Sequence, residues 1–323
     1  MKAFITGIGG FAGQFLTRFL LSHGVEVSGA LRPTGEALAP ELKQVKTYTL
    51  DILDAAEVDR AMLAASPDLI FHLAAQANVP LAWQDPEDTY RINVIGQLHV
   101  LEAARKLPTM PRVLVISSNE VYGPPEGPHE LPLRETNPMR PTNPYAVSKV
   151  TQDMMAYQYF KAFGMPVIRA RPFNHIGPNQ TDAYVAAAFA RQVAEAEAGV
   201  REPVVRVGNL EALRDFSDVR DIVRGYYLAI TKGVPGEAYN LGSGKAISIR
   251  SILDYFVSHS TIPISVEPDP ARMRPVDVPC VYADCSKIRA ATGWEPMIPL
   301  EQTLSDVLEY WRAQHAASPA SPH

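Results

Sequence analysis

The sequence predicts an α/β protein with a doubly wound parallel sheet and a smaller, interleaved α/β lobe. Three observations predict this fold class. Short apolar runs alternate with longer amphipathic stretches up to residue 172, a glycine-rich turn follows the first run, and the alternation is lost after Pro172, where Asn, Gly and Pro become frequent. Alternating strand and helix patterns are typical of repeated β–α–β units around a parallel sheet.

The regular part of the chain gives the individual elements. Strands are predicted at about 2–6, 25–31, 45–50, 68–73, 112–117 and 166–171. Helices are predicted between them, at about 11–23, 54–65, 86–107 and 144–163. The last helix has the clearest boundaries, since Asn143 is a favourable N-cap, Pro144 suits the first helical position and Gly164 suits the end.

Composition excludes several classes of protein. With 46% apolar and 20% charged residues, the chain is unlike a disordered protein, and no apolar run approaches the roughly 20 residues of a membrane-spanning helix. A net charge of −5 disfavours general binding to nucleic acid or anionic membranes. Glycines interrupt the apolar amino terminus, unlike in a signal peptide, so we expect a cytoplasmic protein. Cys280 and Cys285 lack metal-ligand spacing, so neither a disulfide framework nor a metal site is predicted.

The glycine-rich turn between the first strand and the first helix predicts a dinucleotide site. Its glycines let backbone N–H groups at a helix N-terminus approach a pyrophosphate. The alternative is a tight turn without a ligand, but the position between strand and helix favours the dinucleotide. The predicted cofactor contacts of this turn are Gly7, Gly10, Phe11 and Gly13.

The end of the second strand indicates which dinucleotide binds. In the Rossmann arrangement, a carboxylate at this point bonds the ribose 2′-hydroxyl of NAD, whereas an arginine meets the 2′-phosphate of NADP. The chain has Arg32 there and no acid at the strand end, which favours NADP(H) and leaves NAD(H) use open. The alternative is that Arg32 is a solvated loop charge. Further cofactor contacts are expected from Asp51 and Ile52 at the adenine and from Leu73, Ala74 and Ala75 along its path.

A tyrosine and a lysine four residues apart predict a catalytic pair. Tyr145 and Lys149 share one face of a helix, where the ammonium would lower the pKa of the phenol and so suit it to give a proton to a carbonyl oxygen. Lys149 can also bond the nicotinamide ribose. Ser118 follows the fifth strand, at the edge where parallel sheets bind ligands, and can polarise the same oxygen. We predict that these three residues act as a unit.

A second tyrosine–lysine pair lies in the same helix. Tyr157 and Lys161 repeat the spacing twelve residues later, which rotates them by about 120° from the first pair, so only one pair can face a cofactor. Tyr145 begins its helix after a proline-rich loop and near Ser118, so we assign the chemistry to it. Tyr157 and Lys161 are expected to have a packing or interface role.

Beyond Pro172 the chain predicts the second lobe. A helix near 183–198 and a strand at 239–241 stand among irregular segments. We expect a dinucleotide-binding domain at 1–172 and about 217–241, a substrate-binding lobe at about 173–216 and 242–312, and a flexible tail at 313–323.

Several longer segments give the sequence a family resemblance. They are GALR at 29–32, HLAAQ at 72–76, RPFNHIGP at 171–178, GNLEALRD at 208–215 and MRP at 273–275. With the glycine turn and the catalytic unit, they make nearly the whole chain resemble the extended short-chain dehydrogenase/reductase family, and more narrowly its GDP-mannose branch. The resemblance implies a GDP-linked sugar as substrate, contacted by Ser118, Asn119, Asn174, Val185, Asn209, Arg214 and Arg274. It puts Asn174 near the sugar and Asn209, Arg214 and Arg274 around the diphosphate; loop turns and surface ion pairs are the alternative roles of these four.

Two departures favour one activity of this branch. Its dehydratases usually have Thr-Ser-Glu or Thr-Asp-Glu where this chain has Ser118-Asn119-Glu120, and the mannose dehydratase has Asn-His-Glu-Ser-Pro-Arg-Arg-Gly where this chain has NHIGPNQ at 174–180. The resemblance therefore implies reduction by NADPH at C4 of GDP-4-keto-6-deoxy-D-mannose. The product would be a GDP-6-deoxyhexose, expected to be GDP-D-rhamnose, with the 6-deoxytalose epimer left open.

Two other functions stay open. One is a dehydratase, or another nucleotide-sugar epimerase or dehydratase, in which Glu120 would abstract the C5 proton; in a reductase Glu120 binds substrate or has no role. The other is a noncatalytic cofactor-binding protein, which the presence of the catalytic unit disfavours.

The resemblance also implies a homodimer. The helices at 86–107 and 144–163 would pair across a two-fold axis as a four-helix bundle and bury Tyr157, Phe160 and Phe163. Packing within the monomer is the alternative. No nucleic-acid, membrane or metal partner is expected.

Overall fold

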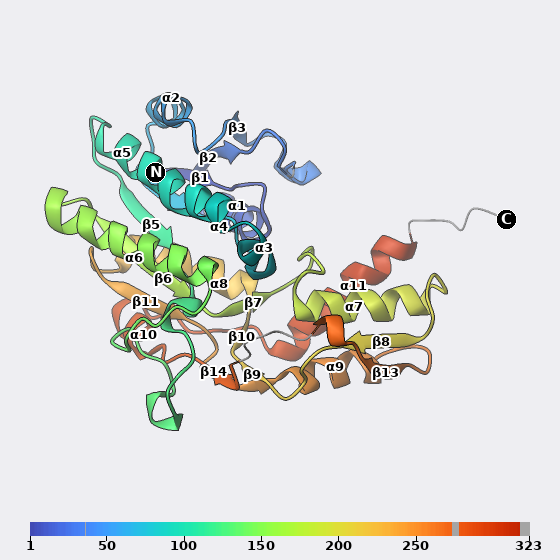
Figure 1. Ribbon diagram of the computed structural model, residues 1–323. Helices are drawn as coiled ribbons and strands as arrows, with labels where there is room; N and C mark the ends of the chain where they lie inside the picture. The colour runs from blue at the N-terminus through green and yellow to red at the C-terminus, as the bar shows by residue number, and fades with distance from the viewer. Residues whose placement is uncertain (36, 273–277, 317–323) are drawn as a thin grey trace.

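The computed structural model describes residues 1–35, 37–272 and 278–316, which form a large sheet with helices on both faces and a smaller lobe beside it (Figure 1). The main sheet has seven strands in the order β11–β6–β5–β4–β1–β2–β3, and every pairing is parallel. Its strands are β1 (Lys2–Thr6), β2 (Glu26–Leu31), β3 (Lys46–Thr49), β4 (Leu69–His72), β5 (Arg112–Ile116), β6 (Val167–Pro172) and β11 (Ala238–Leu241). The predicted fold class is confirmed.

Helices cover both faces of this sheet because successive side chains of a strand point to opposite sides. Ile5 and Phe71 belong to the core on one face, whereas their neighbours Phe4 and Ile70 belong to the core on the other. The first face is covered by α1 (Phe11–Ser22) and α8 (Val219–Lys232), and the second by α2 (Ala55–Ala65), α5 (Gly96–Arg105) and α6 (Pro144–Phe163). This two-sided burial explains why the central strands β1, β4 and β5 are nearly continuous apolar runs.

The segment 86–107 is not the single helix that the periodicity predicts. It contains α4 (Pro86–Tyr90), a π-helical turn (Arg91–Ile95) and α5, and it follows α3 (Val79–Gln84), which the sequence analysis missed. In the π turn, the buried Asn93 amide donates to Ser148 Oγ at 2.8 Å and to the Gln76 carbonyl at 3.0 Å. The prediction of one regular helix was wrong because apolar periodicity does not register such a buried polar contact.

The smaller lobe has its own core, to which Phe189, Phe256 and Leu308 contribute. Its helices are α7 (Val185–Glu197), α9 (Ile249–Ser258) and α11 (Leu300–Ala316), while α10 (Ser286–Thr292) lies against α8 and β11. Short strands pair as β7 (Asn174–Ile176) with β10 (Phe216–Asp218), β8 (Val204–Val207) with β13 (Ser265–Pro268), and β9 (Leu213–Arg214) with both β12 (Ile247–Ser248) and β14 (Cys280–Val281). Most of these were not predicted because strands of two to four residues leave almost no pattern.

The lobe is interleaved with the main sheet. After α7 and β8–β10, the chain returns through α8 to β11, which pairs with β6, and then leaves again. Helix α11 continues to Ala316, past residue 313 where a tail is expected, and residues 317–323 lie outside the described part. The exact residue bounds of the two predicted domains stay a prediction.

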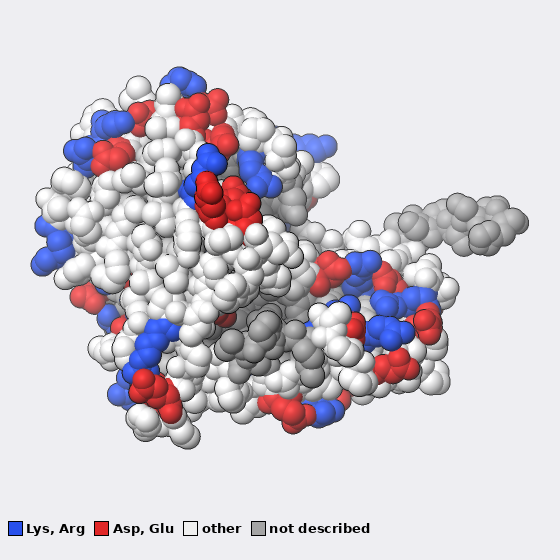
Figure 2. Space-filling view, in the orientation of Figure 1, with Lys and Arg blue, Asp and Glu red and all other residues white. Residues whose placement is uncertain are grey.

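The described surface shows no dominant charge. On the face in Figure 2, Lys and Arg side chains alternate with Asp and Glu, and the surface over α6 carries few of either. Over the residues described, none of the helices combines the length and the apolar content that crossing a bilayer requires.

Candidate active site

The candidate site lies at the carboxyl edge of the main sheet. Strands β1, β4 and β5 are parallel and end at this edge, so the glycine turn after β1 and the loops after β4 and β5 meet there. Helix α6 begins beside the loop after β5, and its Lys149 Nζ donates to the carbonyl of Ile116, the last residue of β5, at 2.9 Å. The sheet thus brings residues from distant parts of the sequence together.

The glycine turn is packed closely against the loop after β4. Gly7 has a φ of +72°, and a Cβ on it would lie 3.0 Å from backbone atoms of Ala74. A Cβ on Gly13 would lie 2.3 Å from the Gly7 carbonyl oxygen, so a side chain there would displace the turn. Gly10 is the N-cap of α1 and supplies no side-chain cap, which leaves the first N–H groups of the helix available to an anion. This cradle has the form that a pyrophosphate requires.

Phe11 connects the glycine turn to the smaller lobe. Its ring stacks on the imidazole of His175 in β7, with centroids 6.1 Å apart and planes within 6°. A Cβ on Gly177 would lie 3.4 Å from the same ring. Phe11 is therefore half-buried between the predicted cofactor turn and the strand that carries Asn174.

Arg32 is exposed directly after β2. Within the described ranges, no acidic side chain forms an ion pair with its guanidinium. An exposed guanidinium at this strand end can meet a phosphate. Its predicted role as the 2′-phosphate contact fits this position.

The other predicted cofactor residues follow β3 and β4. Asp51 is exposed, and its Oδ1 accepts a bond from the Leu53 N–H at 2.9 Å. Ile52 packs against Gly96, where an added Cβ would lie 2.8 Å from Ile52 Cγ2. The residues after β4 are half-buried and next to the glycine turn: Leu73, Ala74 and Ala75.

The structure brings Ser118, Tyr145 and Lys149 together. Tyr145 is 9% exposed, and the Ser118 side chain lies close enough to its phenol to lower the pKa of the phenol. Lys149 Nζ lies 5.8 Å from the centroid of the Tyr145 ring. The predicted unit therefore exists as a spatial cluster.

The pKa of the Tyr145 phenol is raised, not lowered. Burial is the main cause, the hydrogen bond with Ser118 opposes it, and the nearby Tyr184 and Glu120 raise the pKa further. Burial also lowers the pKa of Lys149 to about 7. The expectation that Lys149 makes the phenol more acidic was wrong because desolvation of the charged forms dominates. Tyr145 is accordingly a protonated phenol near neutral pH, which is the form that a proton donor needs.

Asn143 ties the start of α6 to the loop after β5. Its Oδ1 accepts a bond from the Ala146 N–H at 2.8 Å, which confirms the predicted N-cap. Its Nδ2 donates to Glu120 Oε2 at 3.0 Å. Glu120 lies in a 3-10 turn (Asn119–Tyr122) that begins with the half-buried Asn119 and is capped by Ser118 Oγ, which accepts the Glu120 N–H at 3.2 Å.

A buried polar chain behind the cluster was not predicted. His72 Nδ1 lies 2.8 Å from Thr6 Oγ1, and its Nε2 lies 3.4 Å from the amide nitrogen of Gln152 on α6. Burial, together with the charge of Lys149, lowers the pKa of His72 to about 3, so the imidazole is neutral. Its position at the end of a predicted strand was visible in the sequence, but the contact with α6 depends on the tertiary fold.

The second tyrosine–lysine pair lies apart from the cluster. Tyr157 is 37% exposed, and the Arg169 guanidinium lies 5.0 Å from its ring centroid. Lys161 is exposed. Of these two tyrosines, Tyr145 is the one whose phenol interacts with Ser118.

The predicted substrate residues lie mainly on the smaller lobe. Asn174 is half-buried in β7, and Val185 is the half-buried first residue of α7. Asn209 is exposed, and its Oδ1 accepts the Glu211 N–H at 2.9 Å. Arg214 donates to the carbonyls of Leu213 at 2.9 Å and Val278 at 2.5 Å. Arg274 lies outside the described residues.

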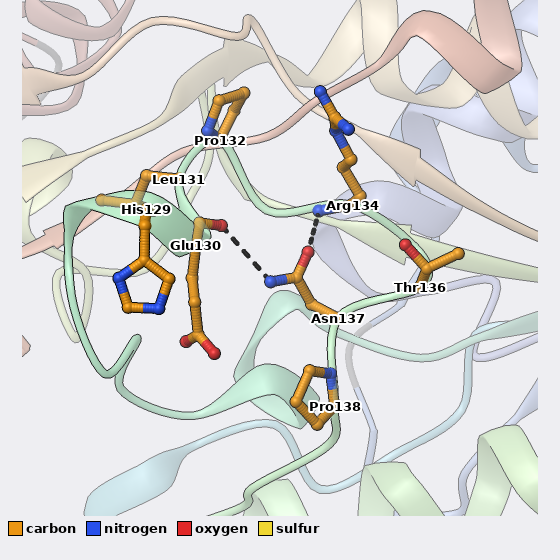
Figure 3. Close-up of a pocket in the computed structure, with 8 residues that line it drawn as sticks. All are labelled: His129, Glu130, Leu131, Pro132, Arg134, Thr136, Asn137 and Pro138. Carbon is orange, nitrogen blue, oxygen red and sulfur yellow. Dashed lines mark hydrogen bonds between the residues drawn. The ribbon is translucent and has the colours of Figure 1, made fainter.

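A separate hollow of about 370 Å³ lies in the loop between β5 and α6 (Figure 3). Asn137 organises it by donating to the Glu130 carbonyl at 3.3 Å and accepting the Arg134 N–H at 2.8 Å. Its lining comes from one segment: His129, Glu130, Leu131, Pro132, Arg134, Thr136, Asn137 and Pro138. Because this lining includes none of the predicted site residues, the hollow is distinct from the candidate active site.

No metal centre accompanies the cluster in the described ranges, where no three His, Cys, Asp or Glu side chains gather in a way that could hold an ion.

A family model described as GDP-mannose 4,6 dehydratase matches residues 4–307. The chain belongs to this family. Membership confirms the resemblance to the GDP-mannose branch of the extended short-chain dehydrogenases/reductases. The relatives similar to this chain include proteins named for both activities of the branch.

Similar members of the GDP-mannose dehydratase family match nearly end to end. The GDP-6-deoxy-D-mannose reductase of Pseudomonas aeruginosa is 34% identical over 97% of this chain and 98% of its own length. The GDP-mannose 4,6-dehydratase of Yersinia enterocolitica is 28% identical over 95% of this chain and 92% of its own length.

Solved structures agree with this family assignment. RMD from Pseudomonas aeruginosa, complexed with NADPH, has a TM-score of 0.85 and 33% identity over 97% of this chain and 99% of that chain. Thermus thermophilus UDP-glucose 4-epimerase, complexed with NAD, has a TM-score of 0.84 and 28% identity over 97% of this chain and 99% of that chain.

Proposed function

We propose that this protein is an NADPH-dependent reductase of the C4 keto group of GDP-4-keto-6-deoxy-D-mannose, with GDP-D-rhamnose as product. The observation that carries the proposal is the buried, protonated Tyr145 phenol next to the Ser118 side chain, at the sheet edge that also carries the glycine turn. A keto oxygen placed between these hydroxyls would be polarised by Ser118 and would receive its proton from Tyr145. The 34% identity to the Pseudomonas aeruginosa reductase supports the substrate.

The glycine turn and its neighbours fit NADP(H). NADPH would supply the hydride for C4. The cradle at Gly13, which a single Cβ would fill, and the uncapped N-terminus of α1 suit the pyrophosphate, while Arg32 suits a 2′-phosphate. Lys149 would bond the nicotinamide ribose. The full proposed set is Gly7, Gly10, Phe11, Gly13, Arg32, Asp51, Ile52, Leu73, Ala74, Ala75, Tyr145 and Lys149, and use of NAD(H) as well stays open.

The nucleotide sugar would extend from the cluster towards the smaller lobe. We assign Asn119 and Asn174 to the sugar because both are half-buried close to the cluster and the glycine turn. Val185 begins α7, which has no side-chain cap, so its N–H groups suit a diphosphate oxygen. Asn209, Arg214 and Arg274 would surround the diphosphate.

A GDP-mannose 4,6-dehydratase is the second candidate. The observation that favours it is the Glu120 carboxylate, which lies close enough to Tyr145 to raise the pKa of the phenol and could abstract the C5 proton. Against it, one Glu120 oxygen is bonded to the helix cap Asn143, and the sequence departs from the dehydratases at 118–120 and 174–180.

The two candidates differ in their use of NADPH. With purified protein and freshly made GDP-4-keto-6-deoxy-D-mannose, we expect NADPH to be oxidised in step with loss of the keto-sugar, followed by its near-ultraviolet absorbance. A dehydratase recycles its cofactor, so conversion of GDP-mannose without added NADPH, and no oxidation with the keto-sugar, would refute the reductase.

Replacement of Arg32 tests the cofactor preference. Arg32→Asp removes a charge-assisted contact with the 2′-phosphate and adds a repulsive charge, so NADPH should bind about 10- to 100-fold more weakly while NADH binding changes little. Dissociation constants measured by nucleotide fluorescence give the ratio. The exposed Arg289 is the control, and Arg289→Asp should leave the ratio unchanged. An unchanged ratio for Arg32→Asp would mean that Arg32 is only a solvated charge.

We also propose a homodimer, in which α6 and the α4–α5 segment of two copies form a four-helix bundle. Apolar side chains on these elements are 37–44% exposed: Tyr90, Ile95, Val147, Met154, Tyr157 and Phe163. Three of them line an apolar hollow between α4 and α6: Tyr90, Ile95 and Val147. Phe160 instead packs inside the monomer against Gly236, so we leave it out of the interface.

A charged side chain in the centre of the proposed interface on α6 should dissociate the dimer. Met154→Lys is expected to halve the mass measured by light scattering, because an ammonium would be buried without a partner. The exposed Met297 lies away from α6, and Met297→Lys is the control. A wild-type mass equal to that of one chain would remove the dimer proposal.

The proposed reductase function also assigns a role to each part of the chain. We assign 1–172 and about 217–241 to cofactor binding, about 173–216 and 242–312 to substrate binding, and the cytoplasm as the location.

A further inference from the structure

We infer that Tyr184 is a substrate-binding residue whose phenol hydroxyl contacts the hexose of the nucleotide sugar from the smaller lobe. The inference rests on the proposed function, which puts the hexose at Tyr145. No pattern in the sequence singles out Tyr184. The contacts of its side chain do.

Tyr184 stands where three segments converge. It is the residue immediately before α7 of the smaller lobe. Its hydroxyl donates to the carbonyl of Ala77, in the loop between β4 and α3, at 3.5 Å. Its phenol also acts electrostatically on Tyr145 at the start of α6. One side chain of the smaller lobe thus reaches the carboxyl edge of the main sheet, within range of an electrostatic effect on the proposed proton donor.

The two ends of the Tyr184 side chain have different surroundings. The side chain is 40% exposed as a whole, yet its hydroxyl turns inward onto the Ala77 carbonyl of the main-sheet domain, and burial raises the pKa of the phenol. A surface tyrosine usually packs its ring and leaves its hydroxyl in water. The reverse arrangement suits a group that covers a ligand with its ring and bonds it with its hydroxyl.

The hydrogen bond of Tyr184 is weak enough to be exchanged for a ligand. Its length of 3.5 Å exceeds the usual O–H···O distance of about 2.7–2.8 Å, and none of the other described residues bonds this hydroxyl. Tyr122 shows the contrast, because its buried hydroxyl donates to Asn240 Oδ1 at 2.6 Å and accepts from Arg171 at 3.0 Å. The Tyr122 hydroxyl uses its hydrogen bonds within the protein, whereas the Tyr184 hydroxyl makes one long bond and can still bond a ligand.

The hexose is the part of the ligand that would meet this hydroxyl. Reduction requires C4 of the hexose at Tyr145, and Tyr184 reaches the same sheet edge through Ala77 and acts electrostatically on Tyr145. A phenol can both donate to and accept from a sugar hydroxyl, and its ring can cover an apolar C–H face of a pyranose. The guanosine diphosphate, by contrast, would lie towards the first turn of α7 and Arg214.

Tyr184→Phe tests the inference by removing only the hydroxyl. The probes are GDP and GDP-mannose, titrated by calorimetry, because they differ by the hexose. We expect GDP-mannose to bind about three- to tenfold more weakly to the variant, with GDP and NADPH binding unchanged. The KM for the keto-sugar should rise by a similar factor. Tyr157→Phe, at 37% exposure, is the matched control and should change none of these values.

Two results would overturn the inference. Equal weakening of GDP and GDP-mannose would place the contact on the nucleotide, and unchanged binding of both would show that the hydroxyl has no ligand. Both results are measured by ligand binding, not by turnover. If the wild-type protein binds these ligands but does not oxidise NADPH, the proposed reaction is wrong, and the comparison of GDP with GDP-mannose still tests the role of Tyr184. Unchanged NADPH affinity shows that the variant is folded.

Discussion

Tyr145→Phe is expected to lower kcat for the keto-sugar by about 10²- to 10⁴-fold, which is the contribution of a positioned proton donor. The phenol is buried, protonated and next to the Ser118 side chain, and Phe retains its ring while removing its proton. NADPH affinity should change little, because the glycine turn and Arg32 are untouched. Steady-state rates at saturating NADPH and nucleotide fluorescence measure the two quantities.

Tyr157→Phe is the control for this prediction. It repeats the same chemical change in the same helix, at a tyrosine that lies against Arg169 and not against Ser118. We expect its kcat to equal that of the wild type. A large loss in Tyr157→Phe with little loss in Tyr145→Phe would show that the wrong pair was assigned.

Asp153→Ala is expected to lower the free energy of unfolding by about 3–5 kcal/mol. The Asp153 carboxylate is fully buried and accepts bonds from Arg169 at 2.7 Å and Arg171 at 2.8 Å. Removal would leave two buried guanidinium groups without a counter-charge, and these groups lie on β6, in the interior of the main sheet. Denaturant unfolding followed by circular dichroism measures the loss.

The matched control is Asp59→Ala, which breaks an ion pair of similar length on the surface. Asp59 and Lys106 are 2.7 Å apart, with side chains 36% and 56% exposed, so the loss should stay below about 1 kcal/mol. Similar losses in the two variants would contradict the assigned importance of the buried cluster.

Acid should weaken the Asp153 cluster in a defined direction. Burial alone would raise the pKa of Asp153, but the ion pairs with Arg171 and Arg169 outweigh it and hold the pKa below the usual 3.8. Because the folded pKa is the lower one, the stabilisation is complete above pH 3.8 and is lost as the pH falls through the folded value. The stability difference between the wild type and Asp153→Ala should therefore shrink only in acid.

Most of the main sheet could be predicted because its strands are buried on both faces. Residues such as Phe4 and Ile5 face different helices, so the strand appears in the sequence as an unbroken apolar run between turns. The segment 86–107 could not be predicted correctly, since Asn93 stabilises a π turn through partners at Gln76 and Ser148. The short strands of the smaller lobe carry too few residues for a pattern.

The candidate site was predictable where sequence spacing fixes geometry. Tyr145 and Lys149 share a helix face, and Ser118 follows a strand at the ligand edge, so the three meet. The direction in which the pKa of Tyr145 shifts was not predictable, because the shift depends on burial. The contacts of His72 and Tyr184 were missed for a related reason: each joins segments that are far apart in the sequence.

The central claim is that hydride passes from NADPH to C4 of the sugar and stays there. The most direct test uses NADPH carrying deuterium at the transferable position of the nicotinamide, with GDP-4-keto-6-deoxy-D-mannose as substrate and the product examined by NMR. We predict one deuterium on C4 of the hexose for each NADPH oxidised, whichever C4 epimer forms. A product without deuterium, or with deuterium on C6, would contradict the reductase and indicate the internally recycled hydride of a dehydratase.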